Sequence, residues 1–238
     1  MTKRCNLRCI HCYARAENET YRGNELSTDE GKRLIDDLAE FGVPVILFSG
    51  GEPVLRKDLP DLIDYAVKKG LRAVISTNGT LITEEKAKQF ARYALSYIGI
   101  SIDGTGKVND AFRGVDGAYD LAINGVRNAK HAGIKVGLRF TINKKNYNEI
   151  QRIFDIIETE GIQRVCFYHL VYAGRGSQLI NEDISHEESR KVVDYIMDRT
   201  KESFKKGSPI EVLTVDNHAD GPYVYLRLLQ EDSQRAKE

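Results

Sequence analysis

The segment that decides the fold is LSTDEGKRLIDDLAEFGVPVILFSG, residues 26–50. Its first part places apolar residues at helical spacing on one face, formed by Leu34, Ile35, Leu38 and Phe41. Ser27 and Glu30 carry the signature of a capping box at the start, and Gly42 suits a left-handed stop at the end. The run VPVILFSG is continuously apolar and ends in a turn, as expected of a strand buried in a parallel sheet. The segment therefore predicts a helix followed by a buried strand.

The same order of helix and strand repeats along the chain. Further helices are predicted at residues 59–69, 83–93, 117–132, 147–160 and 185–206. Further strands are predicted at residues 72–76, 97–102, 135–142 and 164–171, which makes five strands with the first. This alternation is typical of parallel βα units with right-handed crossovers. It predicts an α/β protein with an open or partial βα barrel, and a doubly wound sheet is the alternative.

Each predicted strand ends in small or polar residues. The endings read SGGE, STNG, SIDG, TIN and HLVYAGRG. In parallel α/β folds the carboxyl ends of the strands meet on one face and hold the ligand. Any single ending could be an ordinary turn, because Ser, Asn, Asp and Gly dominate turns. Several such endings on one face favour a binding site.

Composition argues against several classes of protein. Lys+Arg and Asp+Glu both number 35, so the formal net charge is zero, which argues against nucleic acid as the main partner. The apolar runs fall far short of the roughly 20 residues that span a bilayer, and no signal segment is recognisable. The 238 residues suit one large domain, or one domain plus a fragment of another. We expect a cytoplasmic, reducing location, where crowded thiols favour a metal site over disulfides.

Three of the four cysteines, Cys5, Cys9 and Cys12, lie close together near the start of the chain. Thiolates are soft ligands that select iron–sulfur clusters, zinc or copper(I). A zinc site could use His11 as a fourth ligand, but the adjacent residues His11 and Cys12 would have difficulty reaching one tetrahedral ion. In a four-iron cluster, three thiolates would leave one iron open for chemistry. The remaining thiol, Cys166, is expected to pack within a strand.

The cysteine motif CNLRCIHC is followed in order by SGGEP, STNG and SIDG. In this combination the chain resembles the radical S-adenosylmethionine (SAM) superfamily over essentially its whole length. The resemblance implies a partial (βα)6 barrel of the radical SAM type, with the cysteine loop after the first strand. Only Met1–Arg4 precede Cys5, so we expect a barrel that lacks its first strand. Such a chain would expose a sheet edge, be less stable than a longer form, and be weakly active or inactive.

The resemblance also implies a cofactor at the cysteines. Cys5, Cys9 and Cys12 would hold a [4Fe-4S] cluster whose open iron binds the amino and carboxylate groups of SAM. An electron, supplied by a donor such as ferredoxin or flavodoxin, would cleave SAM and give a 5′-deoxyadenosyl radical that removes a hydrogen atom from the substrate. The protein would position that radical and exclude water and oxygen, so no general acid or base is assigned.

A second motif is implied to bind SAM directly. Ser49, Gly50, Gly51 and Glu52 match the GGE motif of the superfamily. Its glycines would let the backbone approach the ligand, and Glu52 would accept hydrogen bonds from the SAM ammonium. The alternative is a plain turn with a solvated Glu52. Tyr13, directly after the third cysteine, is expected near the ligand.

Polar residues at later strand ends complete the implied SAM site. Ser101 and Asp103 share one strand face and are expected to contact the ribose hydroxyls, with Asn78 as a weaker candidate. Arg139 needs an anionic partner if it is buried, and either the SAM carboxylate or an internal salt bridge would provide one. His169 is expected either near the adenine or as a hydrogen-bonded core histidine.

The outer segments narrow the resemblance to one branch of the superfamily. FYHLVYAGRGS and VLTVDNHADGPYVYLRLL are similar to enzymes that act on tetrapyrroles in sirohaem-dependent haem biosynthesis and in making d-type haems. The similarity implies removal of acetate side chains from 12,18-didecarboxysirohaem, which gives iron-coproporphyrin. Arg175 would pair with a substrate carboxylate or be a solvated loop charge. His218 and Asp220 would contact the substrate or form a turn.

Two alternatives stay open at this point. One is a peptide-modifying radical SAM maturase with the same core, and the other is a non-catalytic iron–sulfur or zinc binding module. Residues 1–209 are assigned to the radical SAM core and residues 210–238 to the start of a C-terminal extension. Members of both enzyme branches usually continue into a cysteine-rich domain with an auxiliary cluster. No cysteine follows Cys166, so we expect that domain to be absent from this chain.

Overall fold

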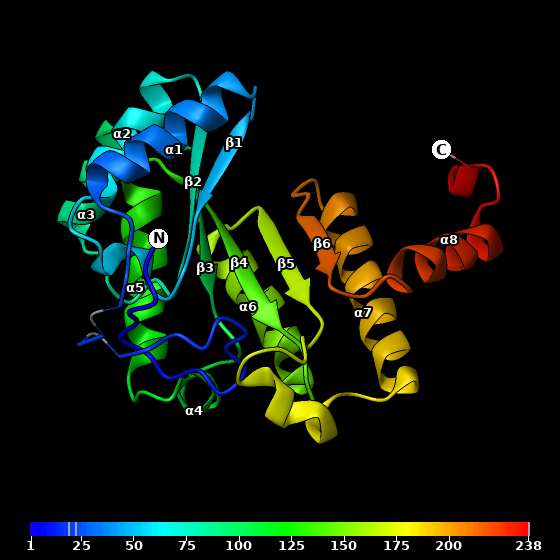
Figure 1. Cartoon of the computed structure of the whole chain (residues 1–238). Coiled ribbons are helices and arrows are strands. Elements are labelled where there is room, and N and C mark those ends of the chain that lie inside the picture. The colour runs from blue at the N-terminus through cyan, green and yellow to red at the C-terminus, as the bar shows by residue number, and fades with distance from the viewer. Residues whose placement is uncertain (19, 22, 238) are drawn as a thin grey trace.

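The computed structural model describes residues 1–18, 20, 21 and 23–237, and in them helices and strands alternate as predicted (Figure 1). The strands are β1 Val45–Phe48, β2 Arg72–Thr77, β3 Tyr97–Ser101, β4 Lys135–Thr141, β5 Arg164–Tyr168 and β6 Glu211–Val215. The helices are α1 Thr28–Glu40, α2 Leu59–Lys68, α3 Glu84–Arg92, α4 Lys107–Arg113, α5 Ala118–His131, α6 Ile150–Glu160, α7 His186–Lys205 and α8 Asp220–Glu231. Short 3-10 helices are η1 Pro53–Leu55, η2 Tyr147–Glu149, η3 Gly176–Glu182 and η4 Arg235–Lys237.

The strands of the described chain form one parallel sheet in the order β1-β2-β3-β4-β5-β6. The register places Ile100 of β3 opposite Leu138 of β4. β1 and β6 lie at opposite edges and do not pair with each other, so the barrel is open (Figure 1). This arrangement confirms the predicted partial barrel. No helix in the described part of the chain is long and apolar enough to cross a membrane.

The prediction of five strands is wrong, because the sheet of the described residues has six. β6 has the sequence EVLTV and pairs with β5 along its whole length. Its pattern is hard to recognise because its residues mix polar with apolar side chains, and they stay partly or fully exposed. α4 and α8 were also not expected. β6 joins the same sheet as the core strands, and the proposed division at residue 209 stays a prediction.

Residues 1–18, which carry the three clustered cysteines and are called the cysteine loop below, form an irregular segment. Within residues 1–18 the structure contains no strand, and the isolated parallel bridge there joins Arg4 to Glu17. The backbone of this loop runs beside the GGE turn, where Gly51 N donates to Thr2 O and Glu52 N donates to Arg4 O, both at 2.7 Å. These bonds place the first residues of the chain against the carboxyl end of β1.

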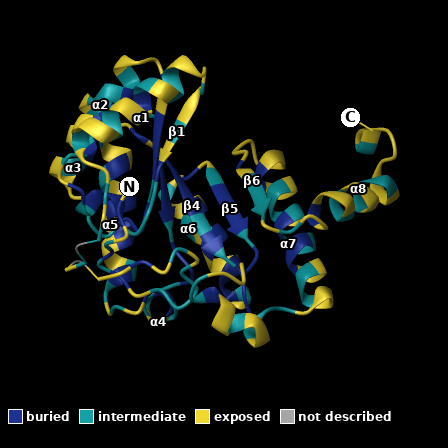
Figure 2. Cartoon of the chain, in the orientation of Figure 1, coloured by how far each residue is buried: buried dark blue, intermediate teal, exposed yellow. Residues whose placement is uncertain are grey.

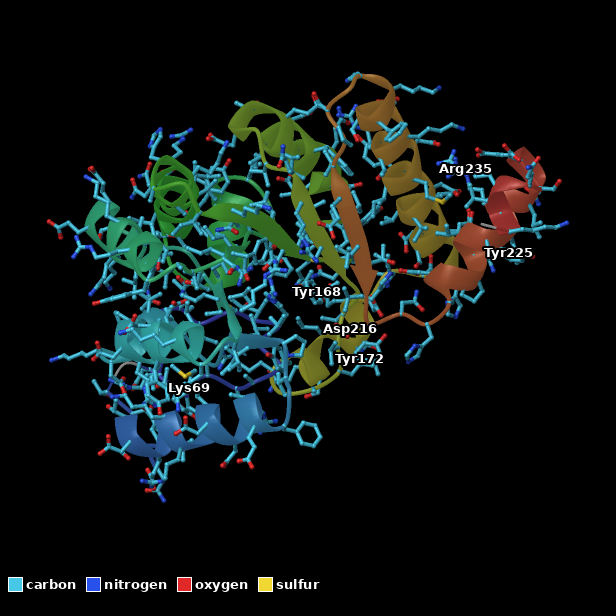
Figure 3. All side chains as sticks on the ribbon, turned by 90° about the horizontal axis from the view of Figure 1, so that it is seen from above. Lys69, Tyr168, Tyr172, Asp216, Tyr225 and Arg235 are labelled. Carbon is cyan, nitrogen blue, oxygen red and sulfur yellow. The ribbon has the colours of Figure 1, made fainter. Side chains whose placement is uncertain are left out.

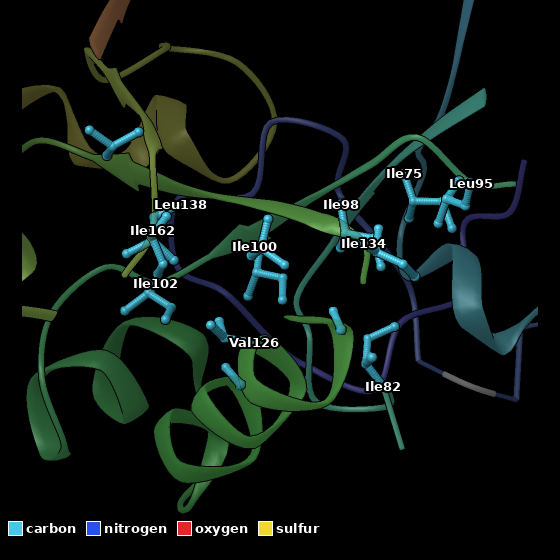
Figure 4. Close-up of a cluster of buried hydrophobic side chains, with 14 of the residues drawn as sticks. Ile75, Ile82, Leu95, Ile98, Ile100, Ile102, Val126, Ile134, Leu138 and Ile162 are labelled. Carbon is cyan, nitrogen blue, oxygen red and sulfur yellow. The ribbon is translucent and has the colours of Figure 1, made fainter. Parts of the chain in front are cut away.

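The outer face of the sheet carries the hydrophobic core (Figure 4). Side chains alternate along a strand, so Ile98 and Ile100 of β3 share one face, and Ile102 continues the row after the strand. All three are fully buried in one cluster with Val126 of α5. Each such isoleucine contributes roughly 1.5–3 kcal/mol through burial. This apolar layer fixes the sheet against its helices and leaves the other face free for polar residues.

The inner face of the sheet combines glycines with long polar side chains. Gly99 and Gly137 lie opposite each other on β3 and β4. A Cβ at Gly99 would lie 2.5 Å from Nε of Arg139, and a Cβ at Gly137 would overlap the hydroxyl of Tyr97. Glycine at these positions therefore lets Arg139 and Tyr97 lie across neighbouring strands.

Candidate functional site

A cavity of about 440 Å³ lies between the carboxyl ends of the strands and the cysteine loop. Figure 1 shows that loop in dark blue, beside α4 and near the arrowheads of β4 and β5. Twelve residues predicted for the site line the cavity, namely Cys5, Cys9, Cys12, Tyr13, Ser49, Gly50, Gly51, Asn78, Ser101, Arg139, His169 and Arg175. Residues that lie far apart in the sequence therefore meet at the predicted edge of the sheet.

Glu52 lies behind the cavity wall and is completely buried, with an exposed fraction of 0%. Its carboxylate accepts hydrogen bonds from Val54 N at 3.0 Å, Thr77 Oγ1 at 2.7 Å and Asn78 N at 2.8 Å. Burial raises the pKa of this carboxyl above its ordinary value. The alternative of a solvated Glu52 is therefore wrong, and the predicted contact with the SAM ammonium stays a prediction.

The structure separates Asp103 from Ser101. β3 ends at Ser101, which lines the cavity, whereas Asp103 lies beyond the strand and is fully buried. Asp103 forms an ion pair with Arg113 at 2.6 Å and accepts a hydrogen bond from Thr141 N at 2.7 Å. His218, in contrast, is exposed and does not line the cavity. The ribose role of Asp103 and the substrate role of His218 stay predictions.

The three cysteine sulfur atoms are suited to hold a metal cluster as thiolates. Each accepts a hydrogen bond from an N–H group: Leu7 N to Cys5 at 3.4 Å, Arg113 Nη1 to Cys9 at 3.6 Å, and Ala16 N to Cys12 at 3.4 Å. Such donors stabilise negative charge on sulfur. The three thiols also line one cavity, so the residues fit a cluster held from one side.

Burial affects the protonation of two of these thiols. It raises the pKa of Cys5 to about 11, and it raises the pKa of Cys9 above its ordinary value. Both side chains are therefore thiols in the metal-free protein at neutral pH, and metal binding would release protons. His11, which the zinc alternative would use, instead lies 3.3 Å from Asp103 through Nε2.

Two elements hold the cysteine loop by its backbone. From one side, Arg8 N donates to Arg113 O at 2.9 Å and Ile10 N donates to Phe112 O at 3.0 Å, both at the end of α4. From the other side, Arg175 donates to Cys9 O from Nε at 2.8 Å and to Ala16 O from Nη1 at 2.9 Å. Arg175 is therefore not a free solvated charge. Its predicted contact with a substrate carboxylate stays a prediction.

Arg139 offers positive charge to the cavity. Its guanidinium carbon lies 5.8 Å from the ring centre of Tyr168. Its Nε is buried without a hydrogen-bond partner, and within the described residues the side chain makes no ion pair. The internal salt bridge considered from the sequence is therefore not formed there. An arginine in this state suits an incoming carboxylate, because its fork matches carboxylate geometry.

His169 and Tyr13 occupy different parts of the cavity. His169 Nε2 lies 2.9 Å from Asp220 Oδ2, and Asp220 also accepts a hydrogen bond from Asn217 Nδ2 at 2.8 Å. His169 therefore combines a hydrogen-bonded, buried position with a place in the cavity wall. Tyr13 is 65% exposed and lies at the rim.

Asn78, the weaker candidate for the ribose, lies beside the cysteine loop, where its Nδ2 donates to Asn6 Oδ1 at 2.8 Å.

Several lining residues were not found by sequence reasoning, namely Ser76, Arg113, Thr141, Tyr168 and Asp216. Figure 3 shows Tyr168 and Asp216 close together at the ends of β5 and β6. Ser76 and Thr141 belong to the strand endings STNG and TIN, which could have indicated them. Arg113 has no such signal, because it ends a helix that the sequence pattern does not reveal.

The sequence model of the Radical SAM superfamily matches residues 1–157, so the chain belongs to this superfamily of enzymes. The predicted family is confirmed. Fe-coproporphyrin III synthase of Methanosarcina barkeri (strain Fusaro / DSM 804) is 62% identical over 238 residues, which are 100% of this chain and 59% of that relative. Pre-heme d1 synthase of Dinoroseobacter shibae (strain DSM 16493 / NCIMB 14021 / DFL 12) is 42% identical over 229 residues, 94% of this chain and 55% of that relative.

These two relatives confirm the predicted resemblance to the tetrapyrrole-modifying branch, and they do not favour the alternatives. The chain spans between 55% and 59% of their length. Among solved structures, Streptococcus suis SuiB bound to S-adenosylmethionine superposes with a TM-score of 0.78 at 19% sequence identity. That match covers 93% of this chain and 50% of SuiB, and it shows a shared fold.

Proposed function

We propose that the protein is a radical SAM enzyme of haem biosynthesis. It would remove acetate side chains from 12,18-didecarboxysirohaem and so give iron-coproporphyrin. The observation that carries this proposal is the 62% identity with Fe-coproporphyrin III synthase across all 238 residues. It is supported by three cysteines and by Arg139, which makes no ion pair within the described residues, around one cavity at the strand ends.

The residues of the cavity divide into those for the cluster and those for SAM. Cys5, Cys9 and Cys12 would hold a [4Fe-4S] cluster, because each sulfur accepts an N–H donor and faces the same cavity. When bound, the cluster and SAM supply a 5′-deoxyadenosyl radical that removes hydrogen from the substrate. Arg139 would bind the SAM carboxylate, and Ser101 would contact the ribose.

Other residues would keep the reacting groups in place. Arg175 and the end of α4 hold the cysteine loop from two sides, which fixes the positions of the three sulfur atoms. Gly50 and Gly51 let the loop backbone approach the turn that carries the predicted SAM contacts. A donor such as ferredoxin or flavodoxin would supply the electron.

The test is anaerobic reconstitution with iron and sulfide, followed by mass spectrometry of SAM reactions. Sirohaem-derived tetrapyrroles and peptides would be supplied in parallel. We expect 5′-deoxyadenosine together with a tetrapyrrole whose mass shows the loss of acetate side chains. The matched control is Cys12→Ala, which should form neither product. Modification of the peptide alone would overturn the substrate, and retention of zinc without visible absorbance would overturn the enzyme assignment.

A further inference from the structure

Arg113 places a buried positive charge against one cysteine of the proposed cluster. Its side chain is 8% exposed. Nη1 lies 3.6 Å from the sulfur of Cys9, and Nη2 lies 2.6 Å from Oδ2 of Asp103. Among the cysteine sulfurs in the described structure, that of Cys9 is the one that accepts a hydrogen bond from a charged side chain.

The position of this guanidinium is fixed by the fold. α4 ends at Arg113, and the next residue, Gly114, adopts a left-handed conformation with φ 69°. Its missing side chain leaves room for the cysteine loop, because a Cβ there would lie 2.8 Å from Arg8 O. The loop in turn donates to the carbonyls of Phe112 and Arg113. The same few residues thus hold both the loop and the charge that faces it.

Asp103 balances only part of this charge. It pairs with Arg113, and it also accepts a hydrogen bond from Thr141 N and contacts His11. An arginine side chain keeps its charge in proteins, so a positive guanidinium lies beside the sulfur of Cys9.

A positive charge in this position would change the reduction potential of the cluster. Hydrogen bonds to cluster sulfur atoms and nearby positive charge favour the reduced state, because reduction adds negative charge. A buried charge has a strong effect on this potential, since the dielectric constant around it is low. Removing Asp103 would have the opposite effect to removing Arg113, because the two charges have opposite sign.

We propose that Arg113 is a positioning residue that raises the reduction potential of the cluster through Cys9, and that Asp103 limits this effect. The proposal rests on the cluster of the proposed function but not on its tetrapyrrole substrate. It assigns a function to the buried ion pair between Arg113 and Asp103.

The test is an anaerobic redox titration of the reconstituted 238-residue chain, followed by electron paramagnetic resonance of the reduced cluster. Four variants are compared with the wild type at equal iron content. We expect Arg113→Met to shift the midpoint potential to more negative values and Arg113→Lys to restore much of it. Asp103→Asn should shift it to more positive values. Arg127→Met, which removes an exposed arginine paired with Glu160, should not move it.

The outcomes separate this proposal from the function on which it rests. If wild-type protein takes up no iron and sulfide, both fail. If Arg113→Met carries full iron and has the wild-type potential, only the role of Arg113 fails. If that variant loses its cluster, Asp103→Asn still decides, because an unchanged or more negative potential would overturn the proposal.

Discussion

The cysteine loop and helix α8 differ in both secondary structure and burial. The loop has no helix or strand of its own, yet Cys5 and Leu7 within it are buried. α8 is a regular helix whose side chains are mostly exposed or half-buried, and Asp220 at its start is the buried one among them (Figure 2). Regular secondary structure is therefore a poor guide to how firmly a segment is fixed in this protein.

The difference lies in what each segment contacts. The backbone of the loop donates hydrogen bonds to carbonyl oxygens of α4, and it accepts them from the GGE turn and from the side chain of Arg175. α8 is held largely by surface charges, where Arg227 pairs with Asp194 at 2.8 Å and with Asp198 at 2.5 Å on α7. Exposed ion pairs contribute little, whereas buried backbone groups must keep their partners. The loop should therefore be sensitive to single changes and α8 tolerant of them.

The largest expected contrast is between two arginines. Arg175→Met removes the bonds to Cys9 O and Ala16 O and should reduce cluster retention by about 10–100-fold. Arg227→Met, which removes the ion pairs of α8 with Asp194 and Asp198, should leave cluster retention unchanged. The measurement is the rate at which a chelator removes iron from each reconstituted variant. Equal rates for both variants would show that the loop does not depend on this anchor.

A second contrast compares two glycines. A Cβ at Gly51 would overlap the carbonyl oxygen of Arg4, so Gly51→Ala should lower the free energy of unfolding by roughly 1–3 kcal/mol. A Cβ at Gly221 in α8 would meet nothing within 4 Å, and Gly221→Ala should be neutral or stabilise by up to about 1 kcal/mol. Urea denaturation of both variants gives the two values. A neutral Gly51→Ala would mean that the first residues of the chain can move away.

The smallest expected effect concerns pH. Hydrogen bonds from Arg56 hold the pKa of Asp58 below its ordinary value, and Arg56 also donates to Met1 O at 3.2 Å. A carboxyl whose pKa is lower in the folded than in the unfolded state stabilises the protein at pH values above the unfolded-state pKa. This stabilisation is lost as the pH falls through the folded-state pKa. Asp58→Asn should therefore cost no more than about 1 kcal/mol at neutral pH.

This difference between wild type and Asp58→Asn should begin to shrink as the pH falls below about 4, where the unfolded state takes up the proton first. It should be lost once the pH has fallen through the lowered folded-state pKa, where the carboxyl is protonated in both states. Thermal unfolding at a series of pH values measures it. A difference that stays constant down to the acid limit would assign the effect to lost hydrogen-bond geometry and not to charge.

Much of the fold follows from local patterns in the sequence. The strands β2 to β5 are buried runs that end in small or polar residues, and their shared edge predicts where the cavity lies. β6 does not follow, because its sequence EVLTV mixes polar with apolar residues and so lacks a continuous apolar run. Ser101 ends β3 and lines the cavity, whereas Asp103 lies beyond the strand, where it pairs with Arg113 and is fully buried. The position of Arg113 in the cavity wall depends on how α4 packs against the cysteine loop, and no local sequence pattern indicates that contact.

The attachment of Thr2–Arg4 to the GGE turn has a practical consequence for handling the protein. Thr2 is buried, and its carbonyl oxygen accepts the bond from Gly51 beside the cavity. An affinity tag joined directly to the amino end would therefore pull on the site that a purification is meant to preserve. Residues 235–237 lie on the far side of α8 from the strand ends (Figure 3), so a tag or fluorescent label belongs at that end.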